Sequence, residues 1–119
     1  MIFKEILQMP DSTTTIQQLK DSDEKFKLDR IWSRYHTPQD LAVSISIEAA
    51  ELLEIFQWGL REKDLDEEKL ERVKEEFADV LLYCLSLANA IDADVTTIVN
   101  DKIKLNAEKY PVGKAKGEK

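Results

Sequence analysis

The chain has 119 residues, of which 43% are hydrophobic and 34% charged, and it contains only three glycines and three prolines. This length fits one domain, and the scarcity of turn-forming residues favours long helices over strands. The formal net charge of −7 excludes a broad surface for nucleic-acid polymers, because such surfaces depend on clustered lysines and arginines.

The sequence also indicates a cellular compartment. Its single cysteine, Cys84, provides neither a disulfide framework nor metal-ligand spacing. No apolar run reaches the roughly eighteen residues of a membrane-spanning helix, and the N-terminal MIFKEILQMP lacks the features of a signal peptide. We therefore expect a cytoplasmic protein that binds no membrane.

The first half of the chain predicts two long helices after an N-terminal segment, residues 1–13. A polar cluster follows Pro10 and is typical of a helix N-cap region, so a first helix is predicted over 14–34. Thr37 is expected to cap a second helix over 38–58, with Pro38 at its first position, where a missing N–H does no harm.

The second half predicts two more helices. A charge-rich stretch over 61–71 is expected to form a solvated turn and the start of a third helix, which extends to about Ala90. Asp94 is a suitable N-cap for a last helix from Val95 to about Glu108. Residues 113–119 are expected to form a flexible tail.

The two central helices are apolar on more than one face. We therefore expect an all-α, four-helix bundle-like subunit with more apolar surface than one copy can cover. Association would cover that surface, so the sequence predicts a homodimer or a homotetramer built as a dimer of dimers.

Two acidic pairs with the same spacing lie inside these apolar helices: Glu48 and Glu51 in SIEAAELLE, and Glu76 and Asp79 in EEFADVLLY. Residues three positions apart lie on one face of a helix. If the two helices pack antiparallel, the four carboxylates converge and repel one another. Divalent cations would remove this conflict.

The ligand type favours Mg²⁺, with Mn²⁺ as a substitute, because all four side chains offer hard, anionic oxygens. Zinc would require Cys or His, and a carboxylate-bridged di-iron centre would require Glu-x-x-His pairs. The only histidine, His36, lies outside both acidic motifs. Mg²⁺ held by a few carboxylates completes its shell with water and substrate phosphates, which indicates phosphate-ester or phosphoanhydride chemistry.

Several longer motifs carry a family resemblance. HTPQDLAVSISIEAAELLEIFQW, preceded by the W-x-x-Y-H-x-P pattern, is followed by EEFADVLLYCLSLA and then by KIKLNAEKYPV. Together they resemble the all-α nucleoside triphosphate pyrophosphohydrolases of the MazG-like superfamily, especially the short dCTPase-like branch. The resemblance implies a catalytic domain over 14–112, with Mg²⁺-dependent hydrolysis of an NTP or dNTP to the monophosphate and pyrophosphate.

The resemblance also implies roles for particular residues. Glu48, Glu51, Glu76 and Asp79 would hold the metal, and Glu51 is the candidate that orients or deprotonates the attacking water. The candidates for substrate binding are Trp32, His36 and Trp58 for the base, Tyr83 for a phosphate or the sugar, and Lys102, Asn106 and Lys109 for the triphosphate. By resemblance we favour dCTP or a related deoxynucleotide.

One alternative from another class stays open. A non-catalytic helical oligomer, or a regulator that binds nucleotide without hydrolysing it, could keep the same fold. Loss of any one of the four acids would favour that alternative, and all four are present. The residue pattern alone identifies neither the base nor the sugar of the nucleotide.

Overall fold

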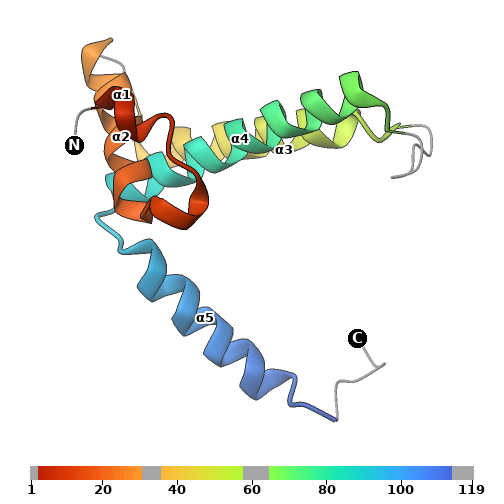
Figure 1. The fold of residues 1–119 in the computed structure, drawn as a ribbon. Helices are drawn as coiled ribbons and strands as arrows, with labels where there is room; N and C mark the ends of the chain where they lie inside the picture. The colour runs from red at the N-terminus through yellow and green to blue at the C-terminus, as the bar shows by residue number, and fades with distance from the viewer. Residues whose placement is uncertain (1–2, 31–35, 58–64, 114–119) are drawn as a thin grey trace.

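The computed structural model describes residues 3–30, 36–57 and 65–113, and no strand occurs within these ranges. The elements in chain order are α1 (Phe3–Ile6), the 3₁₀ turn η1 (Asp11–Thr13), α2 (Ile16–Asp29), α3 (Pro38–Glu54), α4 (Glu67–Ala90) and α5 (Val95–Lys109). In Figure 1, α3 and α4 form a long antiparallel pair, α1 and α2 lie across one end of it, and α5 extends away from the other helices. The predicted all-α class is confirmed.

Two of the predicted helix starts are confirmed by their caps. The Thr37 hydroxyl oxygen accepts a hydrogen bond from the Asp40 amide at 3.1 Å, and Pro38 occupies the first position of α3. The Asp94 carboxylate likewise accepts from the Thr97 amide at 3.1 Å. These polar side chains bond amide groups that have no partner inside the helix, which determines where each helix begins.

The helix predicted over 14–34 is shorter in the structure. Thr15 and Gln18 form a reciprocal capping box, so α2 begins at Ile16. It ends at Asp29, because Arg30 leaves the helical region with φ −110° and ψ 3°. Residues 31–35 lie outside the described part of the chain.

The second predicted helix, 38–58, is also too long. The structure ends α3 at Glu54, and the amide of Ile55 turns back to the carbonyls of Leu52 and Leu53, a tightening that is common at helix ends. The third helix begins at Glu67, where Asp66 caps it, and reaches Ala90 as predicted. The last helix ends one residue later than predicted, at Lys109.

Leu41, Leu85 and Ala88 are buried where α2, α3 and α4 meet, and Ile55 is buried just after α3, at the other end of the α3–α4 pair. A sharp corner follows α4, where Asp92 has a φ of 55°, a left-handed conformation that aspartate tolerates. Lys20 of α2 holds this corner, since its ammonium group donates to the Ala93 carbonyl at 2.8 Å. The axes of α4 and α5 are therefore bent by 103° relative to each other.

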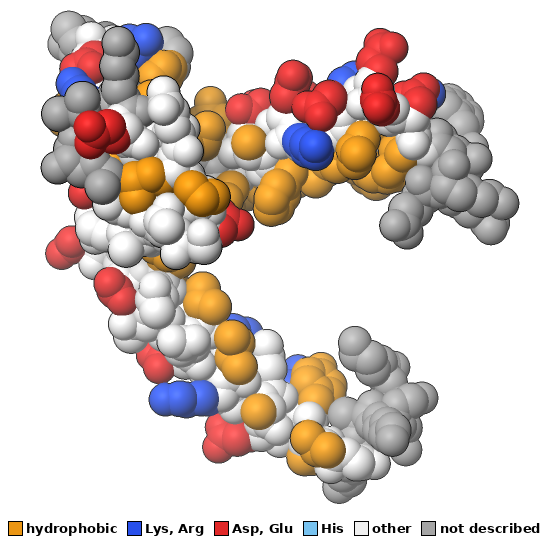
Figure 2. Space-filling model, viewed as in Figure 1, with side chains coloured by type: hydrophobic (Ala, Val, Ile, Leu, Met, Phe, Trp, Pro, Cys, Tyr) orange, Lys and Arg blue, Asp and Glu red, His pale blue; other side chains and the backbone are white. Residues whose placement is uncertain are grey.

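Much apolar surface is left uncovered, so the central helices do not bury several faces within one subunit. Ile47 and Leu53 of α3 are 53% and 68% exposed, Phe77 of α4 is 59% exposed, and α5 buries no residue. Figure 2 shows hydrophobic side chains along the sides of the α3–α4 pair and of α5 that face each other across the open angle. Whether other copies of the chain cover these sides stays a prediction.

No single helix among the described residues is long and apolar enough to cross a membrane, and α4 and α5 reach that length and composition only when counted together across their bend. Cys84 is free and exposed. The division of the chain at residues 13 and 112 stays a prediction. Residues 114–119 of the predicted tail lie outside the described ranges.

Candidate active site

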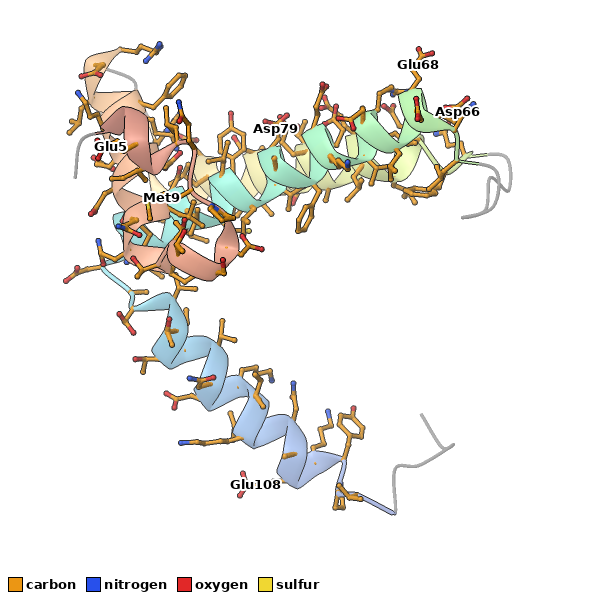
Figure 3. The ribbon with its side chains drawn as sticks, in the orientation of Figure 1. Glu5, Met9, Asp66, Glu68, Asp79 and Glu108 are labelled. Atoms are coloured by element: carbon orange, nitrogen blue, oxygen red, sulfur yellow. The ribbon has the colours of Figure 1, made fainter. Side chains whose placement is uncertain are left out.

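The antiparallel packing of α3 and α4 brings three of the four predicted carboxylates together. Glu48 extends from α3, and Glu76 and Asp79 extend from neighbouring turns of α4; one oxygen of each lies within 4.8 Å of the others. Figure 3 labels Asp79 in the middle of α4, away from both ends of the helix. We refer to Glu48, Glu76 and Asp79 as the carboxylate cluster.

The carboxylates of the cluster repel one another when only protein groups surround them. Removal from water, together with the nearby Glu51, Asp79 and Glu76 carboxylates, raises the pKa of Glu48 to about 7. Removal from water and the charge of Glu51 also raise the pKa of Glu76. Both shifts mean that the negative charge of these groups is poorly compensated.

The donor set of the cluster fits a hard divalent cation. The Oε2 atoms of Glu48 and Glu76 are buried and accept no hydrogen bond from the described residues. Such oxygens would serve as ligands for Mg²⁺ or Mn²⁺. Glu51 is exposed and lies outside the group of oxygens within 4.8 Å, yet it is near enough to raise the pKa of both other glutamates.

A cavity of about 690 Å³ adjoins the cluster, between α2 and α4, and Asp79 is part of its lining. His36, Tyr83, Phe26 and Leu82 also line it, so it combines aromatic and apolar walls with polar groups. A smaller cavity of about 330 Å³ shares Lys27 and His36 with it and extends to Ser86. Cavities of several hundred Å³ with this mixed lining are typical of small-molecule sites.

Two of the predicted substrate residues meet in the larger cavity. The rings of His36 and Tyr83 lie edge to face, with their centroids 6.2 Å apart and their planes at 65°. Burial, reinforced by the charge of Lys27, lowers the pKa of His36, which favours a neutral imidazole. Trp32 and Trp58 lie outside the described residues, so their roles stay predictions.

The structure places the predicted triphosphate contacts far from the cluster within one subunit. Lys102, Asn106 and Lys109 are exposed on α5. Figure 3 shows Glu108, the neighbour of Lys109, at the far end of α5 from the corner, well away from Asp79. A role for these residues in the site therefore requires a second copy of the chain.

A buried ion pair that the sequence did not predict lies beside the cavity. The ammonium group of Lys27 lies 3.4 Å from Asp23 Oδ2, and the two side chains are only 8% and 4% exposed. The Ser86 hydroxyl lies 2.6 Å from the same carboxylate oxygen. Acidic and basic residues four positions apart usually form exposed pairs on helices, so nothing in the sequence distinguished this buried one.

The fold and the cluster define a class of protein: an all-α protein in which a carboxylate cluster, whose donor set fits a divalent cation, adjoins a cavity of about 690 Å³. Residues 43–119 match the model of the MazG-like family, which is more than half of the chain. The chain therefore belongs to the MazG-like family, as its motifs predicted.

Similar proteins agree with this assignment. The chain is 29% identical over 110 residues to dCTP pyrophosphatase 1 of Bos taurus, covering 89% of this chain and 65% of that protein. It is 30% identical over 107 residues to dCTP pyrophosphatase 1 of Rattus norvegicus, covering 87% and 63%. The chain thus spans less than two thirds of the length of these curated relatives.

A solved structure is similar over more of its length. A pyrophosphatase from Archaeoglobus fulgidus, determined by crystallography, matches with a TM-score of 0.70 and 48% sequence identity. The match covers 81% of this chain and 92% of that one. The helical arrangement is therefore shared with this protein over most of both chains.

Proposed function

We propose that this protein hydrolyses a nucleoside triphosphate, dCTP or a related deoxynucleotide, to the monophosphate and pyrophosphate in a reaction that requires Mg²⁺. The observation that carries the proposal is the carboxylate cluster, Glu48, Glu76 and Asp79, beside a cavity of about 690 Å³. A cation site at the edge of such a cavity suits a ligand with a polyphosphate at one end and a ring system at the other. The names of the relatives, dCTP pyrophosphatase 1 and a pyrophosphatase, support the same chemistry.

The cluster and Glu51 would hold the metal, with Mn²⁺ as a substitute for Mg²⁺. Bound Mg²⁺ would neutralise phosphate charge and increase the acidity of the water that attacks the α-phosphorus. Glu51 is the candidate base: it is exposed, so water can reach it, and it lies near the two glutamates whose Oε2 atoms are buried. Tyr83 and His36 would orient the nucleoside from the cavity wall.

We further propose that the active form is a homodimer or homotetramer. Ile98 and Ile103 of α5 are 50% and 58% exposed, and the facing sides of α3 and α4 are equally uncovered. Association would bury these faces, and it would allow Lys102, Asn106 and Lys109 of one copy to reach the cluster of another. The proposal also includes a catalytic domain over 14–112 and the cytoplasm as the compartment.

A product assay tests the proposed reaction. The purified protein is incubated with Mg²⁺ and a panel of NTPs and dNTPs, and monophosphate and pyrophosphate are quantified. We expect both products in equal amounts, their loss with EDTA, and strongly reduced turnover in Glu51→Gln. No turnover of any nucleotide would contradict the enzymatic proposal and favour a binding or regulatory protein, and release of phosphate with a diphosphate would contradict the cleavage position.

A further inference from the structure

Three buried polar atoms without a hydrogen-bond partner line the same cavity. They are Ser22 Oγ, Lys27 Nζ and His36 Nδ1; none of them makes a hydrogen bond within the described residues, although Lys27 Nζ forms an ion pair with Asp23 Oδ2 at 3.4 Å. A polar group without a hydrogen bond in a protein interior is unfavourable, and more so when the group is charged. Their gathering on one wall indicates that this part of the cavity receives a polar group of a ligand.

The most constrained of these atoms belongs to the ion pair of Lys27 and Asp23. The ammonium group of Lys27 can only donate hydrogen bonds, and the carboxylate of Asp23 can only accept them. Both side chains line the cavity, and Ser86 holds the carboxylate by a hydrogen bond of 2.6 Å. The ammonium group is also held above the Tyr83 ring, 5.4 Å from its centroid. The wall therefore presents a donor beside an acceptor in a defined arrangement.

The level at which this pair of α2 contacts α4 fits the base of a nucleotide. Asp79 belongs to the carboxylate cluster, and Ser86, seven residues later on α4, contacts Asp23. At a rise of about 1.5 Å per residue these two levels of the helix are roughly 10 Å apart. A nucleotide whose phosphates lie at the cluster would thus place its base, at the other end of the sugar, beside Lys27 and Asp23.

We propose that Lys27 and Asp23 form hydrogen bonds with the base of the nucleotide. They would select a base that carries an exocyclic amino group over one that carries a keto oxygen at the same position. The proposal rests on the function proposed above and deepens it. In cytosine, the ring nitrogen N3 would accept from Lys27 while the N4 amino group donates to Asp23. In uracil both polarities are reversed, because N3–H faces an ammonium group and O4 faces a carboxylate. Adenine has the same pattern as cytosine, with an acceptor at N1 and a donor at its N6 amino group. Guanine has the same pattern as uracil, with a donor at N1–H and an acceptor at O6.

Two mismatched polar contacts in a buried site discriminate more strongly than packing does. A site built to form hydrogen bonds with its substrate rejects analogues that leave its polar groups unpaired by as much as about 10⁴-fold. The wild-type protein is therefore expected to have a kcat/KM for dCTP at least about 100-fold above that for dUTP. The phosphates of the two nucleotides are identical, so the ratio reports on the base alone.

Asp23→Asn tests the pair directly. The amide of asparagine can donate to O4 as well as accept from N4, so the ratio of kcat/KM for dCTP to that for dUTP should fall at least about tenfold. Inhibition by inorganic tripolyphosphate, which has no base, should stay within about twofold of wild type. Lys25→Met, which alters an exposed lysine of α2 paired with Asp29 at 3.1 Å, is the matched control and should leave the ratio unchanged.

Asp23→Asn leaves the buried charge of Lys27 without its counter-charge, so the double variant Asp23→Asn with Lys27→Met is measured beside it. This variant keeps an acceptor for Ser86, removes both charges, and should also lose the preference for dCTP.

An unchanged ratio in either folded variant, or wild-type turnover of dUTP as fast as that of dCTP, would overturn the assignment. An equal loss for every nucleotide together with weaker tripolyphosphate inhibition would also overturn it, by placing Lys27 at the phosphates. Wild-type protein that releases no pyrophosphate from any nucleotide would instead contradict the proposed function.

Discussion

The ammonium group of Lys27 lies 3.4 Å from the carboxylate of Asp23, and both side chains are more than nine-tenths buried. Such a pair contributes little net stability, because each charge has lost its hydration. Removing one partner alone is nevertheless costly, since an uncompensated charge then stays in the interior. The hydrogen bond from Ser86 to Asp23 offers a way to perturb this pair without changing any charge.

We expect Ser86→Ala to lower the free energy of unfolding by about 1.5–3 kcal/mol, because a buried carboxylate would lose a donor 2.6 Å away. Ser46→Ala is the matched control, since the Ser46 hydroxyl only donates to the carbonyl of Ala42 on an exposed helix surface. Urea denaturation of the two variants and the wild type measures the difference. Equal midpoints for both variants would show that Ser86 does not stabilise the ion pair.

Glu48→Gln is expected to have opposite effects on activity and on stability. It removes an oxygen ligand with full negative charge, so Mg²⁺-dependent turnover should fall by more than about 100-fold. In the metal-free protein it also removes a charge that the neighbouring carboxylates repel, so the melting temperature at pH 8 should rise. Pyrophosphate release and thermal melting in EDTA measure the two effects.

Glu68→Gln makes the same chemical change away from the cluster, in the first turn of α4, where Figure 3 labels Glu68. It should leave turnover unchanged and lower stability by no more than about 1 kcal/mol through its loss from the helix N-terminus. A metal-free Glu48→Gln protein that melts below the wild type at pH 8 would contradict repulsion within the cluster.

The stability of the metal-free protein should fall as the pH rises from about 5 to 8. The pKa of Glu48 is about 7 in the folded chain, against an ordinary value of 4.5, and that of Glu76 is raised as well. Above pH 4.5 the unfolded chain therefore binds fewer protons than the folded chain, and stability is lost as the pH rises through the folded-state pKa values. Thermal melting in EDTA over this range measures the effect.

Mg²⁺ should reverse this trend, because binding to the folded state alone adds stability, about 2.7 kcal/mol when the free ion is at 100 times its Kd. Protons compete with the ion for the same oxygens, so the rise in melting temperature should be larger at pH 8 than at pH 6. An equal shift at both values would place the ion at groups other than Glu48 and Glu76.

Association should depend on the uncovered apolar faces. A charge placed at Phe77 or Ile103, which are 59% and 58% exposed, would have to be buried if these faces pair. We therefore expect Phe77→Glu and Ile103→Glu to lower the oligomeric mass measured by light scattering after size-exclusion chromatography. Arg72→Glu changes an exposed position of the same helix as Phe77 and should leave the mass unchanged. A monomeric wild type would contradict the proposed oligomer.

Part of the fold and of the site is a local property of the sequence. Thr37 followed by Pro38, and Asp94 before Val95, bind nearby amides, so the starts of α3 and α5 could be read directly. The predicted ends of α2 and α3 were less accurate, because helical propensity continues past the residues where the chain turns. The acidic pairs were recognisable because carboxylates are expensive inside apolar helices.

The sequence by itself thus determined an all-α chain, the caps of α3 and α5 and the two acidic pairs, since each depends on spacing within one helix. Only the tertiary structure decided which carboxylates meet. It also decided that Lys27 and Asp23 are buried beside the cavity. Contacts between α2 and α4 join residues more than sixty positions apart, such as Asp23 and Ser86. The direction of α5, away from the other helices, was likewise decided by the tertiary structure. Asp92 adopts a left-handed conformation before α5, and Lys20 donates a hydrogen bond to the carbonyl of Ala93. Helical periodicity determines which residues share a face, but packing between helices determines what that face contacts.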